Sequence, residues 1–127
     1  MAGHYRDLVA WQKGMDLVHR VYELTDRFPK REVYSLTDQI RRAAVSIPSN
    51  IAEGQAHFNN GEFLHFLRHA RGSLAELETQ FLIAERQKYA EPSEVQELLK
   101  SADELSRILS GLINSIKAQR AKTGVGI

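Results

Sequence analysis

The fold is decided by residues 36–54, which read Leu-Thr-Asp-Gln-Ile-Arg-Arg-Ala-Ala-Val-Ser-Ile-Pro-Ser-Asn-Ile-Ala-Glu-Gly. Apolar side chains recur in this stretch at intervals of three and four residues: Leu36, Ile40, Ala43, Ala44, Ile47 and Ile51. That spacing places them on one face of a helix, so we expect the face to be buried against other helices. Pro48 lies within the pattern and lacks a backbone N–H, which predicts a kink in the helix.

A second stripe with the same period is polar and consists of Gln39, Arg42, Ser46, Ser49, Asn50 and Glu53. The side chains of Gln39, Ser46 and Asn50 are expected to satisfy backbone groups around Pro48. Two interpretations of the stripe stay open. It either pairs with a neighbouring helix as a structural element, or it forms part of a ligand site.

The structural interpretation makes a prediction about register. If this helix and the next run antiparallel about a loop at residues 55–60, Arg42 lies opposite Ser73 and Glu76. Asn50 then lies opposite His65 or His69. A buried ion pair between Arg42 and Glu76 would fix this register. The predicted polar stripe then comprises Gln39, Arg42, Ser46, Asn50, Glu53, Ser73 and Glu76.

The first predicted helix, at about residues 7–28, carries two apolar stripes. One contains Leu8, Trp11, Met15, Val18, Tyr22 and Thr25, and the other contains Leu17, Val21, Leu24 and Phe28. Two stripes indicate two neighbours, as in a helix that lies inside a bundle and also contributes to a subunit interface. We therefore expect apolar positions such as Val9 and Leu17 to be buried in a homo-oligomer.

Two more helices are predicted at about residues 61–89 and 93–121, after the one at 35–53. Their apolar faces are Phe63, Leu67, Ala70, Leu74, Leu77, Phe81 and Ala84, and then Val95, Leu98, Ala102, Leu105, Leu109, Leu112 and Ile116. The expected N-caps of the first, second and fourth helices are Asp7, Ser35 or Thr37, and Ser93. Gly72 lies in mid-helix, which indicates close approach by another segment, such as the side chain of Trp11. Residues 122–127 are expected to form a frayed tail.

Four amphipathic helices joined by short loops predict an all-α, antiparallel, up-down-up-down bundle as a single domain over residues 1–127. The composition agrees: 127 residues are 43% hydrophobic and 26% charged, with eight glycines and three prolines. The absence of cysteine excludes disulfides, a thiolate nucleophile and Cys-ligated zinc. No apolar run reaches a membrane-spanning length and Met1–Asp7 lacks a signal-peptide core, so we expect a cytoplasmic protein.

Charge is distributed unevenly, although the net charge is only +1. Residues 91–104 carry five acids and the single base Lys100, whereas the positions after them carry Arg107, Lys117, Arg120 and Lys122 and no acid. Acids at the start and bases at the end of a helix oppose its macrodipole, which is one explanation. The other is a phosphate-binding patch formed by the four basic residues.

No catalytic signature emerges. Glu62-x-x-His65 has the spacing of a di-iron ligand pair, and His65 and His69 stand one turn apart, but a second such motif and further carboxylates are missing. Gly-x-Ser-x-Gly and phosphate-cradling glycine loops are also absent. We therefore predict a protein that is not an enzyme and that holds neither metal nor cofactor.

The run at residues 39–54, the pair Glu62-Phe63 and the segment Ala-Arg-Gly-Ser-Leu-Ala-Glu-Leu-Glu at residues 70–78 resemble the bacterial family of 23S rRNA intervening-sequence proteins, over about residues 7–117. The resemblance implies a left-handed four-helix bundle that assembles into a ring, commonly a homopentamer, of poorly defined molecular activity. A related branch, the accessory variability determinant proteins of diversity-generating retroelements, binds nucleic acid and a reverse transcriptase through a markedly basic surface. This chain departs from that branch in its net charge of +1.

Two functions follow as hypotheses. The first is an oligomeric accessory protein that binds RNA or DNA through the basic end of the fourth helix. The second is an oligomeric scaffold that binds a protein partner. Phosphate contacts weaken steeply with added salt and apolar docking does not, so salt dependence separates the two. Genomic position relative to a ribosomal RNA gene or a retroelement would be the most informative single observation about the partner.

Overall fold

The computed structural model describes residues 4–57 and 59–122. Within them lie the 3-10 turns η1 (Tyr5–Asp7) and η2 (Lys30–Glu32) and the four α-helices α1 (Val9–Thr25), α2 (Leu36–Ala56), α3 (Asn60–Arg86) and α4 (Pro92–Lys122). No strand occurs in this part of the chain, so the all-α prediction is confirmed. Residues 123–127 of the predicted tail lie outside the described residues, and its first position, Lys122, ends α4.

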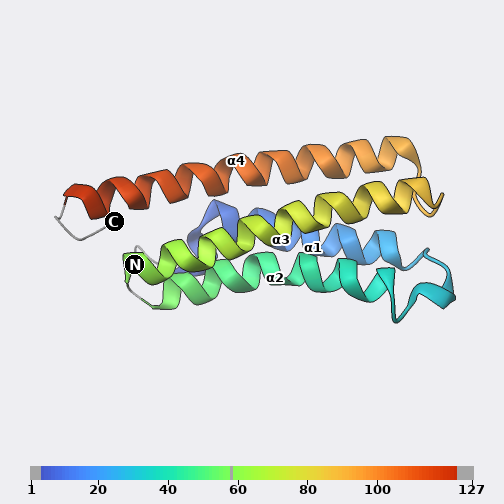
Figure 1. Ribbon diagram of the computed structural model, residues 1–127, viewed down its shortest axis with the longest axis horizontal. Helices are drawn as coiled ribbons and strands as arrows, with labels where there is room; N and C mark the ends of the chain where they lie inside the picture. The colour runs from blue at the N-terminus through green and yellow to red at the C-terminus, as the bar shows by residue number, and fades with distance from the viewer. Residues whose placement is uncertain (1–3, 58, 123–127) are drawn as a thin grey trace.

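The helices lie side by side, as Figure 1 shows, with the chain passing along α1, back along α2, out again along α3 and back along α4. α2 packs against α1 and α3, and α4 packs against α3 and α1. The start of α1, the connection from α2 to α3 and the end of α4 therefore gather at one end of the molecule. None of the helices in the described ranges combines the length and apolar character needed to cross a membrane.

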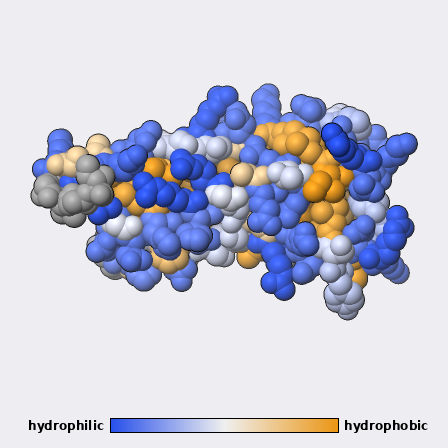
Figure 2. Space-filling model, in the orientation of Figure 1, coloured by the Kyte–Doolittle hydropathy of each residue, from blue (hydrophilic) through white to orange (hydrophobic). Residues whose placement is uncertain are grey.

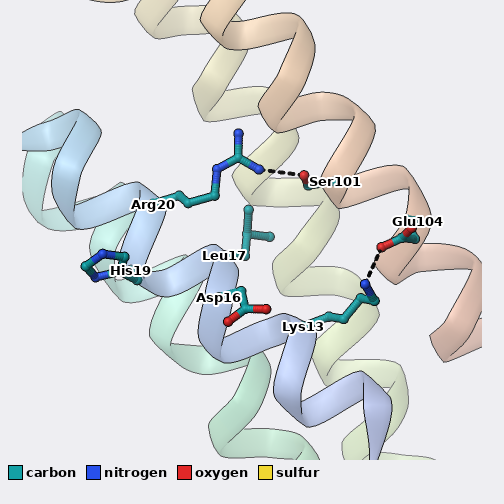
Figure 3. Close-up of a pocket in the computed structure, with 7 residues that line it drawn as sticks. All are labelled: Lys13, Asp16, Leu17, His19, Arg20, Ser101 and Glu104. Atoms are coloured by element: carbon teal, nitrogen blue, oxygen red, sulfur yellow. Dashed lines mark hydrogen bonds and ion pairs between the residues drawn. The ribbon is translucent and has the colours of Figure 1, made fainter.

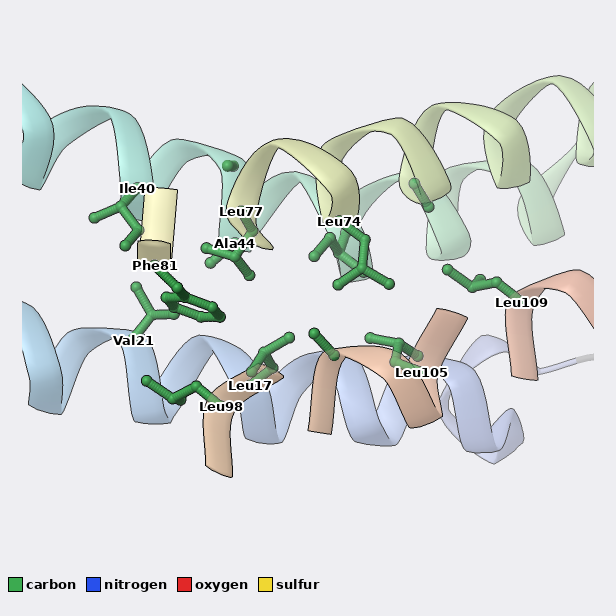
Figure 4. Close-up of a cluster of buried hydrophobic side chains, with 14 of the residues drawn as sticks. Leu17, Val21, Ile40, Ala44, Leu74, Leu77, Phe81, Leu98, Leu105 and Leu109 are labelled. Atoms are coloured by element: carbon green, nitrogen blue, oxygen red, sulfur yellow. The ribbon is translucent and has the colours of Figure 1, made fainter. Parts of the chain in front are cut away.

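The core is built from the apolar faces that the periodicity predicts. Figure 4 shows side chains from all four helices meeting there, including Val21, Ile40, Phe81 and Leu98. Every apolar residue predicted for the face of α2 is buried, with at most 9% of its surface exposed. One position on the predicted apolar face of α4 differs. Leu112 is only half-buried, and its neighbour Ile113 is buried in its place. Burial on this scale supplies the main driving force for folding.

Helix starts depend on side chains that the sequence patterns did not single out. α1 begins after Leu8, which makes no side-chain cap, because Asp7 belongs to the preceding turn η1. The backbone N–H of Leu36 at the start of α2 donates to Glu32 Oε1 at 3.2 Å. α4 begins at Pro92, one residue earlier than predicted, because proline suits the first helical position, where its missing N–H costs nothing. The predicted caps Asp7 and Ser93 are therefore wrong.

The end of α3 is a left-handed stop without a glycine. Lys88 has φ 64° and is the non-glycine residue with positive φ in the described chain. Its N–H donates to Glu85 O at 3.0 Å, and the Tyr89 N–H donates to Ala84 O at 2.9 Å. This pair of bonds is a Schellman motif, which satisfies carbonyls that the helix end would leave unpaired. Helical geometry thus ends at Arg86, earlier than the predicted residue 89.

Close approach between helices occurs at glycines other than the one predicted. A Cβ placed on Gly54 would lie 2.8 Å from the Cβ of Phe66. A Cβ on Gly14 would make ordinary contact with Pro48, at 3.5 Å, where α1 crosses α2. Gly72 is exposed and a Cβ there would meet nothing within 4 Å. The predicted approach of Trp11 to Gly72 is wrong, because Gly72 lies on the outer side of α3.

The seam between α1 and α4 is closed by polar bridges at heptad spacing. Lys13 Nζ lies 2.9 Å from Glu104 Oε1, and Arg20 Nη1 donates to Ser101 Oγ at 2.6 Å, as Figure 3 shows. One heptad further along the chain, just after α1 ends, Arg27 pairs with Glu94. The bond and the charge of Glu104 raise the pKa of Lys13 above its ordinary range. These three bases form a stripe that the apolar periodicity does not reveal.

Candidate functional site

The polar stripe of α2 meets α3 one helical turn away from the predicted register. Ser46 Oγ lies 2.8 Å from Ser73 Oγ. Asn50 Nδ2 donates to Ser46 O at 2.8 Å and to Ser46 Oγ at 2.9 Å. Asn50 therefore satisfies a backbone carbonyl beside Pro48, as the sequence predicts of this side chain. The two serines and Asn50 form a small polar contact between the helices.

The predicted buried pair of Arg42 and Glu76 is wrong. The side chain of Arg42 is 79% exposed and its Nε donates to Asp38 Oδ2, one turn away on the same helix, at 2.9 Å. Glu76 accepts from Gln80 Nε2 at 3.3 Å. Arg42 lies on the outer surface, where water solvates its charge, and Ser46, one turn further along α2, lies opposite Ser73 instead. Gln39 and Glu53 are exposed as well, so most of the stripe is solvated surface.

Three of the four predicted phosphate-binding residues gather at the end of α4. Lys117 and Lys122 are exposed, and the half-buried guanidinium of Arg120 lies over the start of α3, near Gly61. Arg107 does not join them. It lies about 15 Å back along α4, and its Nη2 pairs with Asp103 Oδ2 at 2.7 Å.

Acidic and basic residues occupy different parts of the hairpin of α3 and α4. Between residues 76 and 104 the charged residues are Glu76, Glu78, Glu85, Glu91, Glu94, Glu97, Asp103 and Glu104, against Arg86, Lys88 and Lys100. At residues 53–71 and 105–122 they are Glu53 and Glu62, against Arg68, Arg71, Arg107, Lys117, Arg120 and Lys122. We call the second region, where α2 ends, α3 begins and α4 ends, the basic end. The net charge of +1 conceals this separation.

A hollow of about 410 Å³ between α1 and α4 lies outside the basic end. Figure 3 shows Leu17 between two polar bridges, Lys13 with Glu104 and Arg20 with Ser101. Lys13, Arg20 and Glu104, three of the charged groups that line this hollow, already make bonds across the seam. It therefore serves to join the two helices, which makes it a weaker candidate for ligand binding.

A second hollow, of about 370 Å³, opens at the basic end itself. We call it the amide pocket, and it is lined by Gly54, Gln55, Asn59, Asn60, Phe63, Leu112, Ser115, Ile116 and Gln119. Its wall carries four carboxamide side chains, an aromatic ring and a hydroxyl. Sequence reasoning missed it because α2, α3 and α4 each contribute only part. The concentration of Asn and Gln at residues 55–60 was the available signal.

Histidines cluster beside the basic end. The ring of His57 stacks on Phe66 with centroids 5.3 Å apart, and the rings of His65 and His69 meet edge-on at 4.5 Å. In the described part of the chain, no group of three or more His, Asp or Glu side chains is placed to hold a metal ion. The motif Glu62-x-x-His65 lies at the start of α3, where the backbone N–H of Glu62 donates to Asn59 Oδ1 at 3.0 Å.

Comparison with solved structures finds a protein of unknown function from the S23 ribosomal protein family of Bacteroides thetaiotaomicron. It shares 20% sequence identity and a TM-score of 0.77 with this chain, covering 84% of this chain and 96% of its own. At that identity the likeness concerns the fold. Comparison with curated proteins finds no match. The family model described as 23S rRNA-intervening sequence protein matches residues 6–111, which reach from η1 into α4. The chain therefore belongs to the 23S rRNA-intervening sequence protein family.

Proposed function

We propose that this protein is a non-enzymatic, cytoplasmic, oligomeric accessory protein that binds nucleic acid through its basic end. The observation that carries the proposal is the separation of charge along the hairpin of α3 and α4. Phosphate backbones respond to the local field of a basic surface, which a net charge of +1 does not describe. In finer detail, we propose an antiparallel bundle with a left-handed twist and a kink at Pro48, as the resemblance and the near-3.5 periodicity support.

Exposure supports a role for the basic residues beyond helix stability. Cations at the end of α4 oppose its macrodipole, which contributes only about 0.3 to 1 kcal/mol for each group. The side chains of Lys117 and Lys122 remain exposed, so they are free to approach a phosphate. The family match ends at residue 111, before these lysines. Lys117 and Lys122 therefore lie outside the matched region, whereas Arg68, Arg71 and Arg107 of the basic end lie within it.

Assembly into a homo-oligomer would bring several copies of the basic end together. Leu17 does not contribute to an interface, since it is 2% exposed and lies in the core, but Val9, Met15 and Tyr22 on α1 are 52%, 44% and 41% exposed. On α3, Leu82 and Ile83 are 47% and 42% exposed. Figure 2 shows its larger apolar patch in the half of the molecule where α3 ends. Different apolar faces on one subunit suit a head-to-tail ring. We propose a homopentamer, with light scattering on a sizing column as its test.

In such a ring, weak phosphate contacts add up. Several linked contacts can raise the overall affinity by about 10² or more, provided that one strand reaches adjacent subunits. Binding should be independent of sequence and should weaken as salt is added, because each phosphate contact releases a counterion. Binding that is independent of sequence and sensitive to salt distinguishes nucleic-acid binding from the apolar docking of a protein partner.

The test is filter binding of a labelled single-stranded RNA over a range of salt concentrations. Lys117→Gln with Lys122→Gln should reduce the affinity and flatten the salt dependence. The matched control is Lys88→Gln with Lys100→Gln, which removes the same charge at the opposite end and should leave binding unchanged. Failure of the wild-type protein to retain RNA at low salt, or equal losses in both double variants, would contradict the proposal.

The second candidate is an oligomeric scaffold that binds a protein partner. It is favoured by a groove of about 570 Å³ on the outer side of α1 and α2, lined in part by Tyr22, Arg41 and Val45. The Arg41 guanidinium lies 4.6 Å from the centre of the Tyr22 ring. Exposed aromatic and arginine side chains are typical of binding hot spots. Salt-insensitive partner binding that Tyr22→Ser abolishes would support this function.

A further inference from the structure

We propose that the amide pocket receives the base of an unpaired nucleotide, so that the basic end recognises single-stranded RNA in preference to duplex. This inference rests on the proposed function and identifies the kind of nucleic acid bound. Its starting point is that the pocket and the exposed lysines lie on the same end of the molecule.

The chemistry of the wall suits a nucleobase. A carboxamide carries both a hydrogen-bond donor and a hydrogen-bond acceptor, so it can pair with the donors and acceptors on the edge of a base. The ring of Phe63 and the aliphatic side chains of Leu112 and Ile116 supply the apolar surface on which a base stacks. A volume of about 370 Å³ lies in the range of pockets for small ligands, roughly 300 to 1,000 Å³.

The surrounding charges suit the backbone of the same nucleotide. Ser115 and Gln119 lie one turn apart on α4 at the pocket, and the exposed Lys122, three residues after Gln119, lies on the same face of the helix. Arg120 reaches the start of α3 near Gly61, which follows the pocket residue Asn60 in sequence. A strand that crosses the end of α4 would thus place phosphates near cations and a base over the amides.

Duplex would not satisfy this site. In a duplex the edges of the bases are paired and their faces are stacked, whereas the bases of single strands can turn outward. The amide pocket is a concave hollow formed at the junction of α2, α3 and α4. It can therefore accept a base only when that base is free to leave its neighbours.

The experiment compares three RNAs that carry equal numbers of phosphates: a single strand, a duplex, and a single strand with abasic positions. We expect the single strand to bind at least about fivefold more tightly than the abasic strand, as the loss of one stacked base implies. The duplex should bind as weakly as the abasic strand. Fluorescence anisotropy at fixed low salt measures all three.

Two variants test the pocket itself. Gln119→Ala removes one carboxamide from an exposed position, and Ser115→Phe fills the hollow; both should weaken single-strand binding severalfold and leave duplex binding unchanged. Gln96→Ala removes an exposed carboxamide at the other end of the same helix and is the control. Circular dichroism checks that each variant is folded.

The outcomes separate this inference from the proposed function. If no RNA binds at low salt, the proposed function fails and the inference fails with it. If all three RNAs bind equally and binding needs Lys117 and Lys122 but not Gln119, the basic end is a phosphate surface and only the inference is overturned.

Discussion

Gly54 of α2 lies so close to α3 that a Cβ on this residue would stand 2.8 Å from the Cβ of Phe66. Ordinary Cβ atoms do not approach so closely, so a side chain at position 54 must push the two helices apart. The backbone of Phe63 limits the relief, since its Cα would lie 3.4 Å away. This contact sets the spacing of α2 and α3 next to the amide pocket.

Gly54→Ala should therefore destabilise the fold by about 1 to 3 kcal/mol, the usual cost of overpacking. Gly72→Ala is the matched control, because it adds the same methyl group to an exposed helical position with open space around it. That change should stabilise the protein by about 1 kcal/mol through helix propensity. Urea midpoints measure both, and a neutral or stabilising Gly54→Ala would contradict the contact.

Two neighbouring arginines should respond differently to replacement by methionine. Arg42 is 79% exposed and bonds to Asp38 on its own helix, so Arg42→Met should change the stability by no more than about 0.5 kcal/mol. Arg41 is 27% exposed, and its Nε donates to the buried hydroxyl of Thr25 at 2.8 Å. Arg41→Met should cost about 1.5 kcal/mol. Equal urea midpoints for the two variants would contradict this assignment.

Lys88→Gly should raise the stability by about 0.5 to 1 kcal/mol. Lys88 has φ 64°, a conformation that costs a residue with a Cβ about 1 to 2 kcal/mol, and part of the gain is offset by the greater freedom of glycine in the unfolded chain. Thermal unfolding measures the gain. Lys100→Gly, in the middle of α4, should instead lower the stability by about 1 kcal/mol.

The Glu32 carboxylate should contribute to stability in a pH-dependent way. A hydrogen bond from the Tyr89 hydroxyl, at 2.8 Å, and one from the Leu36 N–H hold the pKa of Glu32 below the ordinary value of 4.5. A carboxyl whose pKa is lowered on folding stabilises the protein above its unfolded pKa, and that stabilisation is lost as pH falls through the lower, folded pKa.

Glu32→Gln should therefore be less stable than wild type at pH 7, and the difference should shrink below pH 4.5. Tyr89→Phe removes the hydrogen bond that lowers the pKa of Glu32 the most, so it should reduce the pH dependence of the stability. Urea unfolding at a series of pH values measures both variants. A difference that stays constant down to the acid limit would mean that the Glu32 bonds do not favour the charged form.

The sequence by itself determined the buried faces of α2 and α3. Burial of an amphipathic helix depends on spacing along one chain, and spacing is visible without a partner. The face from Leu36 to Ile51 and the core face of α3 from Leu67 to Ala84 are buried as the period predicts. The basic residues at the end of α4 were visible for the same reason, since they follow one another along a single helix.

Only the tertiary structure decided which residues meet. A heptad pattern looks nearly the same after a shift of one turn, so it does not distinguish Ser46 facing Ser73 from Arg42 facing Ser73. The register of α2 against α3 depends on close contacts between the two helices, such as that of Gly54 with Phe66. The amide pocket has the same origin. Its residues come from α2, α3 and α4, and their convergence depends on how those helices pack, which the spacing along any single helix does not contain.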